Sequence, residues 1–346
     1  MITEIIKTDE SYYVKKVFEL GKILRDGGLV AFPTETVYGL GGNALDSDAS
    51  RKIYAAKGRP SDNPLIVHVS SSEEVIHYVK EISPLEQKLM DAFWPGPLTI
   101  VFPKEDIIPS ETSGGLSTVA IRCPENKATR ALIKAAGVPL AGPSANISGR
   151  PSPTTAEAVF HDMNGKIQAI VDDGPCRIGL ESTIIGIENN QIVIYRPGGI
   201  TLEMLSSFAP TVVDQAILEA GSHPKAPGMK YRHYAPAAPL TVYTGNQEKV
   251  VRKILTYTTL SDKKYGFLVS RETAEKLPDG SPLFIWGSRD DKESLAHNLF
   301  NGLLYFNEHP VDQIIGEGTD YKGLGLAIMN RMTKASGYHI VVVKKD

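Results

Sequence analysis

Cysteine is scarce in this chain of 346 residues: Cys123 and Cys176 are the two present, and they do not form a CxxC pair. Two isolated cysteines cannot build a zinc site of paired thiolates, which excludes that kind of site. The scarcity is typical of a reducing compartment, so we expect a cytoplasmic protein. The histidines lack HxH, HxxxH and HExxH spacing, and we expect no protein-held metal.

Long hydrophobic runs are also missing. No stretch approaches 18 uninterrupted apolar residues, and the start MITEIIKTDE lacks a basic segment followed by an apolar one. We therefore expect neither a membrane-spanning helix nor a secretory signal. The formal net charge is −3, which argues against a protein that coats nucleic acid with its whole surface but leaves room for a local basic cleft.

Glycine-rich phosphate loops are the third absence. The GLGG of Gly39–Gly42 and the GLGLAIM of Gly323–Met329 are each one glycine short of a dinucleotide loop, and no GxxxxGK[ST] sequence occurs. If the protein binds a nucleotide, side chains must therefore hold its phosphates.

Two domains and a linker are predicted from the length and the pattern. Residues 1–208 alternate short apolar runs with helical patterns, which predicts an α/β fold with some antiparallel strands, because several connections are short. Residues 209–239 contain several prolines and predict an extended linker. Residues 240–346 alternate again and predict a smaller, Rossmann-like α/β domain.

The segment KGRPSDNPLIVHV places two cations beside a helix end. Lys57 and Arg59 flank Gly58, and Pro60 prevents the helix from continuing. Two cations on a kinked backbone can converge on one polyanion. The structural alternative is a helix end whose basic residues complement the helix dipole.

The segment LAGPSANISGRPSPTTAE places Ser144 and Asn146 after a predicted buried strand. Loops at strand ends are the usual position of ligands in α/β sheets. The structural alternative is a turn that leads into the helix expected from Thr154.

Further polar residues lie on or beside expected strands: Thr36, His68, Arg122, Ser182 and Arg196. The alternative to a ligand contact is an exposed or structurally paired side chain for the arginines, a cross-strand hydroxyl pair for Ser182 and a satisfied core residue for His68. No Ser-His-Asp or Cys-His arrangement is visible, so the expected chemistry is positioning and charge neutralisation, without a covalent intermediate.

Eight segments, in order, resemble the YrdC-type threonylcarbamoyl-AMP synthases in their long form with an additional C-terminal domain. They are FPTETVYGLGGNA, KGRPSDNPLIVHV, FWPGPLT, VAIRCP, PLAGPSANISGRPSPT, GLESTII, YRPGGIT and PGMKYRHYAP. The resemblance is close over residues 10–240, and GLGLAIMNRMTKASG resembles the C-terminal domain. It implies an N-terminal YrdC-like twisted mixed sheet with helices and a concave, positively charged pocket.

The resemblance also implies roles for individual residues. The family's KxR…SxN tetrad corresponds to Lys57, Arg59, Ser144 and Asn146. The residues implied for threonine are Thr36, His68, Arg122, Gly142 and Ser182, and those implied for ATP are Arg59, Asn63, Thr118, Ser144, Ser152, Arg196 and Tyr234. The family commonly has alanine at the position of Gly142, a departure that we expect to matter little if the backbone makes the contact.

The implied activity is that of a nucleotidyltransferase of tRNA processing, with ATP, L-threonine and bicarbonate as substrates and Mg²⁺ accompanying ATP. The product would pass to the tRNA threonylcarbamoyl-transferase machinery, and we expect no membrane attachment and no stable nucleic-acid complex. The linker, with Tyr234, is expected to close over the nucleotide as a lid.

Three alternatives share this fold. An RNA-binding protein is disfavoured by the net charge of −3. A carbamoyltransferase maturation factor would need cysteine-paired zinc modules that two cysteines cannot build. A nucleotide-sensing regulator would differ from a synthase in consuming no ATP in response to threonine and bicarbonate.

Overall fold

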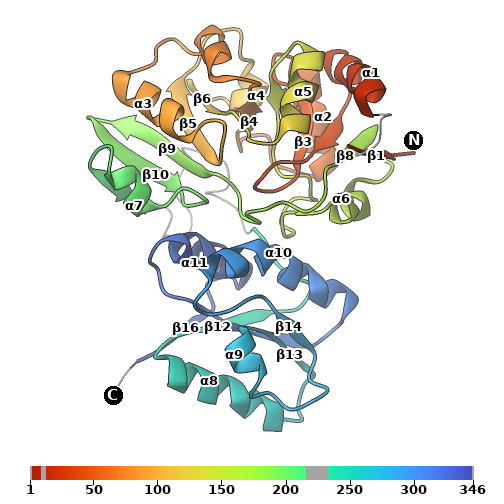
Figure 1. Ribbon diagram of the computed structural model, residues 1–346. Coiled ribbons are helices and arrows are strands. Elements are labelled where there is room, and N and C mark those ends of the chain that lie inside the picture. The colour runs from red at the N-terminus through yellow and green to blue at the C-terminus, as the bar shows by residue number, and fades with distance from the viewer. Residues whose placement is uncertain (1, 9–12, 216–232, 345–346) are drawn as a thin grey trace. The chain divides into compact units, whose positions relative to one another are not determined.

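The structure, a computed structural model, describes residues 2–8, 13–215 and 233–344. The described chain divides into two compact units (Figure 1). The first contains residues 2–148, 152–177 and 181–215, and the second contains residues 233–344 with the short segments 149–151 and 178–180. Each unit is built around its own β-sheet.

The first unit alternates strands and helices, as its sequence pattern predicts. Its strands are β1 (Glu4–Lys7), β2 (Val30–Phe32), β3 (Gly39–Asn43), β4 (Ile66–His68), β5 (Leu98–Pro103), β6 (Thr118–Arg122), β7 (Leu140–Ala141), β8 (Ala169–Asp172), β9 (Thr183–Glu188), β10 (Gln191–Arg196) and β11 (Thr211–Val213). Its helices are α1 (Tyr13–Arg25), α2 (Ser47–Lys57), the 3₁₀ helix η1 (Ser72–His77), α3 (Pro84–Phe93), α4 (Ser110–Ser113), α5 (Lys127–Ala136), α6 (Ala156–Met163) and α7 (Leu202–Ser206).

The strands form one mixed sheet in the order β1-β8-β2-β3-β7-β4-β6-β5-β9-β10-β11. Strands β4 and β6 are parallel, whereas β4 and β7 are antiparallel, which confirms the expected α/β fold with some antiparallel strands. Alternate residues of β2 enter different cores: Val30 and Phe32 pack in a cluster with Leu24 of α1, and Ala31 packs in the larger cluster.

Strand β3 consists mostly of glycine, and its sequence does not predict a strand. A Cβ atom added to Gly39 would lie 2.6 Å from the ring of Phe32, and one added to Gly41 would lie 2.8 Å from the carbonyl oxygen of Val30. Glycine therefore permits β3 to pair with β2 while the Phe32 ring lies across it.

Part of the expected linker belongs to the first sheet. Residues 211–213, within the range 209–239, form β11 and pair with β10 in parallel. Residues 216–232 of the expected linker, including Lys230, Tyr231 and Arg232, lie outside the described residues.

The second unit has a wholly parallel sheet in the order β14-β13-β15-β12-β16. Its elements are β12 (Leu240–Gly245), α8 (Gln247–Thr256), the 3₁₀ helix η3 (Tyr257–Thr259), β13 (Tyr265–Val269), α9 (Arg271–Ala274), β14 (Leu283–Ile285), α10 (Lys292–Glu308), β15 (Gln313–Glu317), α11 (Leu324–Ala335) and β16 (Ile340–Val343). Helices α10 and α11 cover one face of the sheet, and α8 and α9 cover the other (Figure 1). This arrangement confirms the Rossmann-like prediction.

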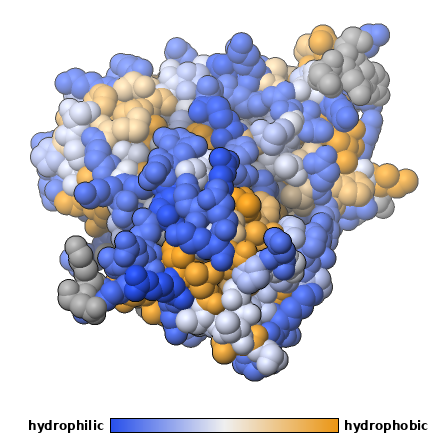
Figure 2. Space-filling model, turned by 60° about the horizontal axis from the view of Figure 1, so that its bottom comes forward, coloured by the Kyte–Doolittle hydropathy of each residue, from blue (hydrophilic) through white to orange (hydrophobic). Residues whose placement is uncertain are grey.

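Across the described residues, no helix is long and apolar enough to cross a membrane. On the face drawn in Figure 2, hydrophilic residues predominate and apolar residues gather in smaller areas.

Candidate active site

Helix α2 ends where the KGR segment begins to turn. Its N-terminus is capped by Asp46, whose carboxylate accepts the N–H of Asp48. At its C-terminus, Gly58 has φ +61°, a left-handed conformation that favours glycine and ends the helix. Lys57 is thus the last helical residue, and Arg59 is the first residue past the turn.

The ammonium of Lys57 connects the two halves of the predicted tetrad. It donates to the carbonyl oxygens of Ser144 and Asn146, the second at 2.5 Å, and Lys57 is 2% exposed. In return, the carbonyl oxygen of Lys57 accepts the N–H of Ser148 at 2.8 Å. Burial, reinforced by the nearby cation of Arg59, lowers the pKa of Lys57 well below its ordinary value.

Arg59 and Asn63 lie in the loop that follows. The guanidinium of Arg59 donates to the carbonyl oxygens of Asn63 at 3.2 Å and Pro64 at 3.0 Å. Asn63 is 1% exposed, yet neither the oxygen nor the nitrogen of its side-chain amide has a hydrogen-bond partner. A buried amide without partners is costly, so this side chain is suited to a ligand that supplies both a donor and an acceptor.

Arg122, the last residue of β6, is held on all sides. Its Nη2 lies 2.5 Å from the carboxylate of Glu35, its Nη1 donates to Thr36 Oγ1 at 2.8 Å, and its Nε donates to the carbonyl oxygen of Gly96 at 3.2 Å. The second carboxylate oxygen of Glu35 accepts the N–H of Glu125 at 3.1 Å. A cation fixed in this way is suited to orient an anionic group.

His68 of β4 lies directly beside Arg122, because the two residues are partners in the parallel β4–β6 register. Burial first, and then the Arg122 guanidinium, lowers the pKa of His68 to about 3, so the imidazole is neutral near pH 7. Its Nδ1 is buried without a hydrogen-bond partner.

Gly142 lies against the same imidazole. A Cβ atom at this position would lie 2.9 Å from Nδ1 of His68 and 2.7 Å from Cζ of Phe32. Atoms that close must shift, so an alanine here would displace these two rings. The expectation that glycine matters little for a backbone contact with the substrate stays a prediction.

Ser182 and Arg196 form a second buried group at the start of β9 and the end of β10. Arg196 donates to the carbonyl oxygen of Ser182 at 2.9 Å and to its Oγ at 3.1 Å, and Ser182 Oγ lies 2.8 Å from Thr99 Oγ1. Buried Ser152 donates to Glu181, the neighbour of Ser182, at 2.6 Å. Half-buried Thr118 begins β6 and lies opposite Pro103 at the end of β5, whereas Thr183 lies opposite Leu98 at its start, so the structure does not bring Thr118 to this group.

Tyr234 belongs to the second unit. Its ring centroid lies 5.1 Å from that of Phe300, and the guanidinium carbon of Arg331 lies 6.0 Å from its ring centroid. The role of Tyr234 at the nucleotide therefore stays a prediction.

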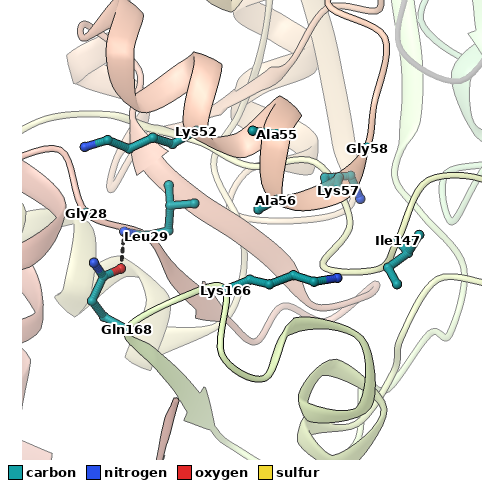
Figure 3. A pocket seen from close by; sticks show the side chains of 10 residues that line it. All are labelled: Gly28, Leu29, Lys52, Ala55, Ala56, Lys57, Gly58, Ile147, Lys166 and Gln168. Atoms are coloured by element: carbon teal, nitrogen blue, oxygen red, sulfur yellow. Dashed lines mark hydrogen bonds between the residues drawn. The ribbon is translucent and has the colours of Figure 1, made fainter. Parts of the chain in front are cut away.

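A cavity of about 580 Å³ lies beside α2 (Figure 3). Lys52, Lys57 and Lys166 line it, and the long side chains of Lys52 and Lys166 extend in opposite directions. Their ammonium groups donate to the carbonyl oxygens of Gly27 at 2.7 Å and Asp162 at 2.9 Å. Lys57 is the one residue assigned by resemblance among those that line this cavity.

The described part of the chain contains no group of three or more His, Cys, Asp or Glu side chains that could hold a metal ion. Burial raises the pKa of Cys123 to about 11 and that of Cys176 to about 12, so both stay protonated thiols near pH 7.

Two residues of the site were not assigned from the sequence. Glu35 fixes Arg122, and Glu181 accepts from Ser152. Each is an acidic residue directly before an assigned residue, Thr36 or Ser182, and is 7% or 6% exposed. Acidic residues are rarely buried without a partner. An acidic residue inside a segment expected to be buried was therefore the sign in the sequence that could have identified them.

Known proteins match this chain over its whole length. Residues 22–198 match the Sua5, YciO and YrdC family, described as telomere recombination, and residues 200–337 match the C-terminal domain of threonylcarbamoyl-AMP synthase. A threonylcarbamoyl-AMP synthase of Pyrococcus abyssi is 45% identical over 99% of this chain and 100% of its own. One of Bacillus subtilis is 42% identical over 98% of this chain and 97% of its own.

A crystal structure shows the same architecture. That of P. abyssi Sua5 complexed with L-threonine has a TM-score of 0.91 and 44% sequence identity, and the match covers 99% of this chain and 100% of that one. Because two family models cover most of the chain and full-length relatives exceed 40% identity, the chain belongs to the threonylcarbamoyl-AMP synthase family, in the form with an additional C-terminal domain.

Proposed function

We propose that this protein is a threonylcarbamoyl-AMP synthase, which forms threonylcarbamoyl-adenylate and pyrophosphate from L-threonine, bicarbonate and ATP. Its full-length relatives carry that name, and a solved relative binds L-threonine. The product serves threonylcarbamoyladenosine modification of tRNA through a separate transferase.

The reaction joins two anions. The threonine amine combines with bicarbonate, releasing water, to give an N-carboxylate. An oxygen of this carboxylate attacks the α-phosphorus of ATP, the bond to the β-phosphate oxygen breaks, and pyrophosphate leaves. Repulsion between the carboxylate and the triphosphate is the main obstacle, so fixed cations and prior orientation supply most of the catalysis.

The single observation that carries the proposal is the bond of the Lys57 ammonium to Ser144 and Asn146. It places the KxR and SxN segments, far apart in the chain, at one point beside Arg59. We assign Lys57 and Arg59 to charge neutralisation, and Arg122 with Thr36 and His68 to threonine.

ATP would bring Mg²⁺ with it. Mg²⁺ usually keeps several waters and is held largely by substrate phosphates. When bound, Mg²⁺ neutralises phosphate charge. The protein's own contribution is then to position the phosphates with the side chains of Arg59, Asn63 and Arg196.

The test measures ATP-dependent pyrophosphate release in the presence of threonine and bicarbonate, with detection of threonylcarbamoyl-AMP by mass spectrometry. Arg59→Ala should lower kcat/KM by about a hundredfold or more, the usual effect of losing a group that stabilises transition-state charge. Lys57→Met, which retains the bulk of the side chain, should have a similar effect.

Lys88→Ala removes an exposed lysine from α3 and is the matched control, expected to leave turnover unchanged. Circular dichroism verifies that each variant folds. Near-normal turnover in folded Arg59→Ala and Lys57→Met would overturn the assignment, and absence of product from the unaltered protein would overturn the function.

A further inference from the structure

A buried hydroxyl of β5 lies against the group formed by Ser182 and Arg196. Thr99, the second residue of β5, is 0% exposed, and its Oγ1 lies 2.8 Å from Ser182 Oγ. The parallel pairing of β5 with β9 places Thr99 opposite Ile184 and brings Ser182, the residue before β9, near it. Thr99 is not among the residues assigned to threonine or to ATP.

The backbone on both sides of Ser182 is held in place. The N–H of Thr183 donates to the carbonyl oxygen of Pro97 at 3.0 Å. A Cβ atom added to Gly198 would lie 2.4 Å from both the carbonyl oxygen of Glu181 and the nitrogen of Thr183, so glycine permits the loop after β10 to pack directly on this backbone. With the backbone fixed, the direction of the Ser182 O–H bond is what remains to be set.

The two hydroxyls and the arginine have one hydrogen-bond acceptor too few. Arg196 Nη2 donates to Ser182 Oγ at 3.1 Å, since a guanidinium has no acceptor. Within the described part of the chain, the hydroxyl of Thr99 bonds to that of Ser182 alone, and the hydroxyl of Ser182 bonds to Thr99 and Arg196 alone. One hydroxyl proton of this buried group therefore has no acceptor in the protein.

A ligand oxygen beside Ser182 would supply the missing acceptor. A buried donor without a partner is costly, and the cost disappears if Thr99 donates to Ser182 and Ser182 donates to the ligand. Of the four tetrahedral directions around Ser182 Oγ, one is the bond to Cβ and two then accept from Thr99 and Arg196. The Ser182 proton is left with a single direction, and two donors on the same oxygen strengthen its own donation.

We propose that Thr99 is a positioning residue of the synthase, whose hydroxyl donates to Ser182 Oγ and thereby directs the Ser182 proton toward an oxygen of bound threonine. This inference rests on the proposed function and on the assignment of Ser182 to threonine. Without the Thr99 hydroxyl, the proton and one lone pair of Ser182 can exchange places, so the hydrogen bond to threonine is no longer set in advance.

Isothermal titration calorimetry on the full chain tests this by measuring the Kd of L-threonine and, separately, that of ATP. Thr99→Val keeps the shape of the side chain and should raise the Kd of L-threonine about fivefold, the effect of one neutral hydrogen bond. The Kd of ATP should change much less, because Arg196 keeps its bond to the carbonyl oxygen of Ser182 at 2.9 Å. Thr99→Ser retains the hydroxyl and should bind L-threonine as the unaltered protein does.

Thr3→Val is the matched control. It removes another buried hydroxyl, which donates to the carbonyl oxygen of Ile167 at 2.7 Å, and should leave both Kd values unchanged. Circular dichroism verifies folding, and Thr99→Ala, which also lacks the hydroxyl, replaces the valine variant if that variant does not fold.

Two results would overturn the proposal: an unchanged Kd of L-threonine in the folded variant without the hydroxyl, or an equal rise in Thr99→Ser, which would indicate packing. Neither measurement needs turnover. Failure here is therefore distinguishable from absence of product in the unaltered protein, which would overturn the proposed function.

Discussion

The carboxylate of Glu35 lies 2.5 Å from the guanidinium of Arg122, and the two side chains are 5% and 4% exposed. A buried pair of this kind contributes little net stability, but removing one partner leaves an uncompensated charge. With Thr36 and the Gly96 carbonyl, Glu35 fixes the direction of the Arg122 guanidinium. Glu35 is thus a positioning residue of the proposed threonine site.

Replacement of Glu35 tests this role. Glu35→Gln should raise the KM for threonine about tenfold and change the KM for ATP much less, because Arg122 loses the charge that holds it. Steady-state kinetics with each substrate varied in turn measures the two effects. Glu125→Gln, which removes an exposed partner of Arg177, is the control and should change neither KM. Equal changes in both KM values would contradict a role specific to threonine.

Replacement of Asn63 should have opposite effects on stability and on activity. Since its buried amide has no partner, Asn63→Leu should raise the free energy of unfolding by about 1 kcal/mol while raising the KM for ATP. Urea denaturation and steady-state kinetics measure the two quantities. A less stable variant with an unchanged KM for ATP would show that the Asn63 amide does not bind ATP.

His68 predicts a pH dependence of stability. Its pKa in the folded protein, about 3, is below the ordinary value of 6.5, so the unfolded chain binds the extra proton as pH falls. The stability that follows from keeping His68 neutral in the folded protein is complete above pH 6.5 and is lost progressively toward pH 3. Between pH 7 and pH 5 it amounts to about 2 kcal/mol. His68→Gln should remove this slope from urea denaturation curves; an identical slope in both proteins would show that another group titrates.

Replacement of Gly142 by a larger residue should have a steric effect on the rings around it. Gly142→Ala should destabilise the protein by about 1–3 kcal/mol, because the new Cβ displaces the rings of Phe32 and His68. Phe32→Leu in the same chain should recover part of the loss by making room. If thermal unfolding of Gly142→Ala matches that of the unaltered protein, the rings adjust freely and the close packing has no consequence.

Much of the site was predictable because its motifs are local. Gly58 and Pro60 set the end of α2 at Lys57, and the alternation of short apolar runs with helical patterns predicted an α/β fold, to which β4 with His68 belongs. The family resemblance then supplied the roles, which stay predictions for individual residues.

What the sequence did not predict depends on distant contacts. Glycine-rich β3 is a strand through its pairing with β2 and β7. Half-exposed β14 has only three residues, too few to show a strand's alternating pattern in the sequence. The bond from Lys57 to Ser144 joins residues 87 apart. Periodicity describes neighbours along the chain and carries no signal for such pairs.

The Lys57 connection also has a consequence for folding order. Its acceptors are the backbone carbonyls of residues 144 and 146, so the connection cannot form until that later loop has docked against α2. Closing so long a segment costs chain entropy before any compensating contact exists. During synthesis the ribosome must therefore release more than 140 residues before Lys57 can bond to its acceptors. Helix α2 can form earlier than the hydrogen bonds of the lysine at its end.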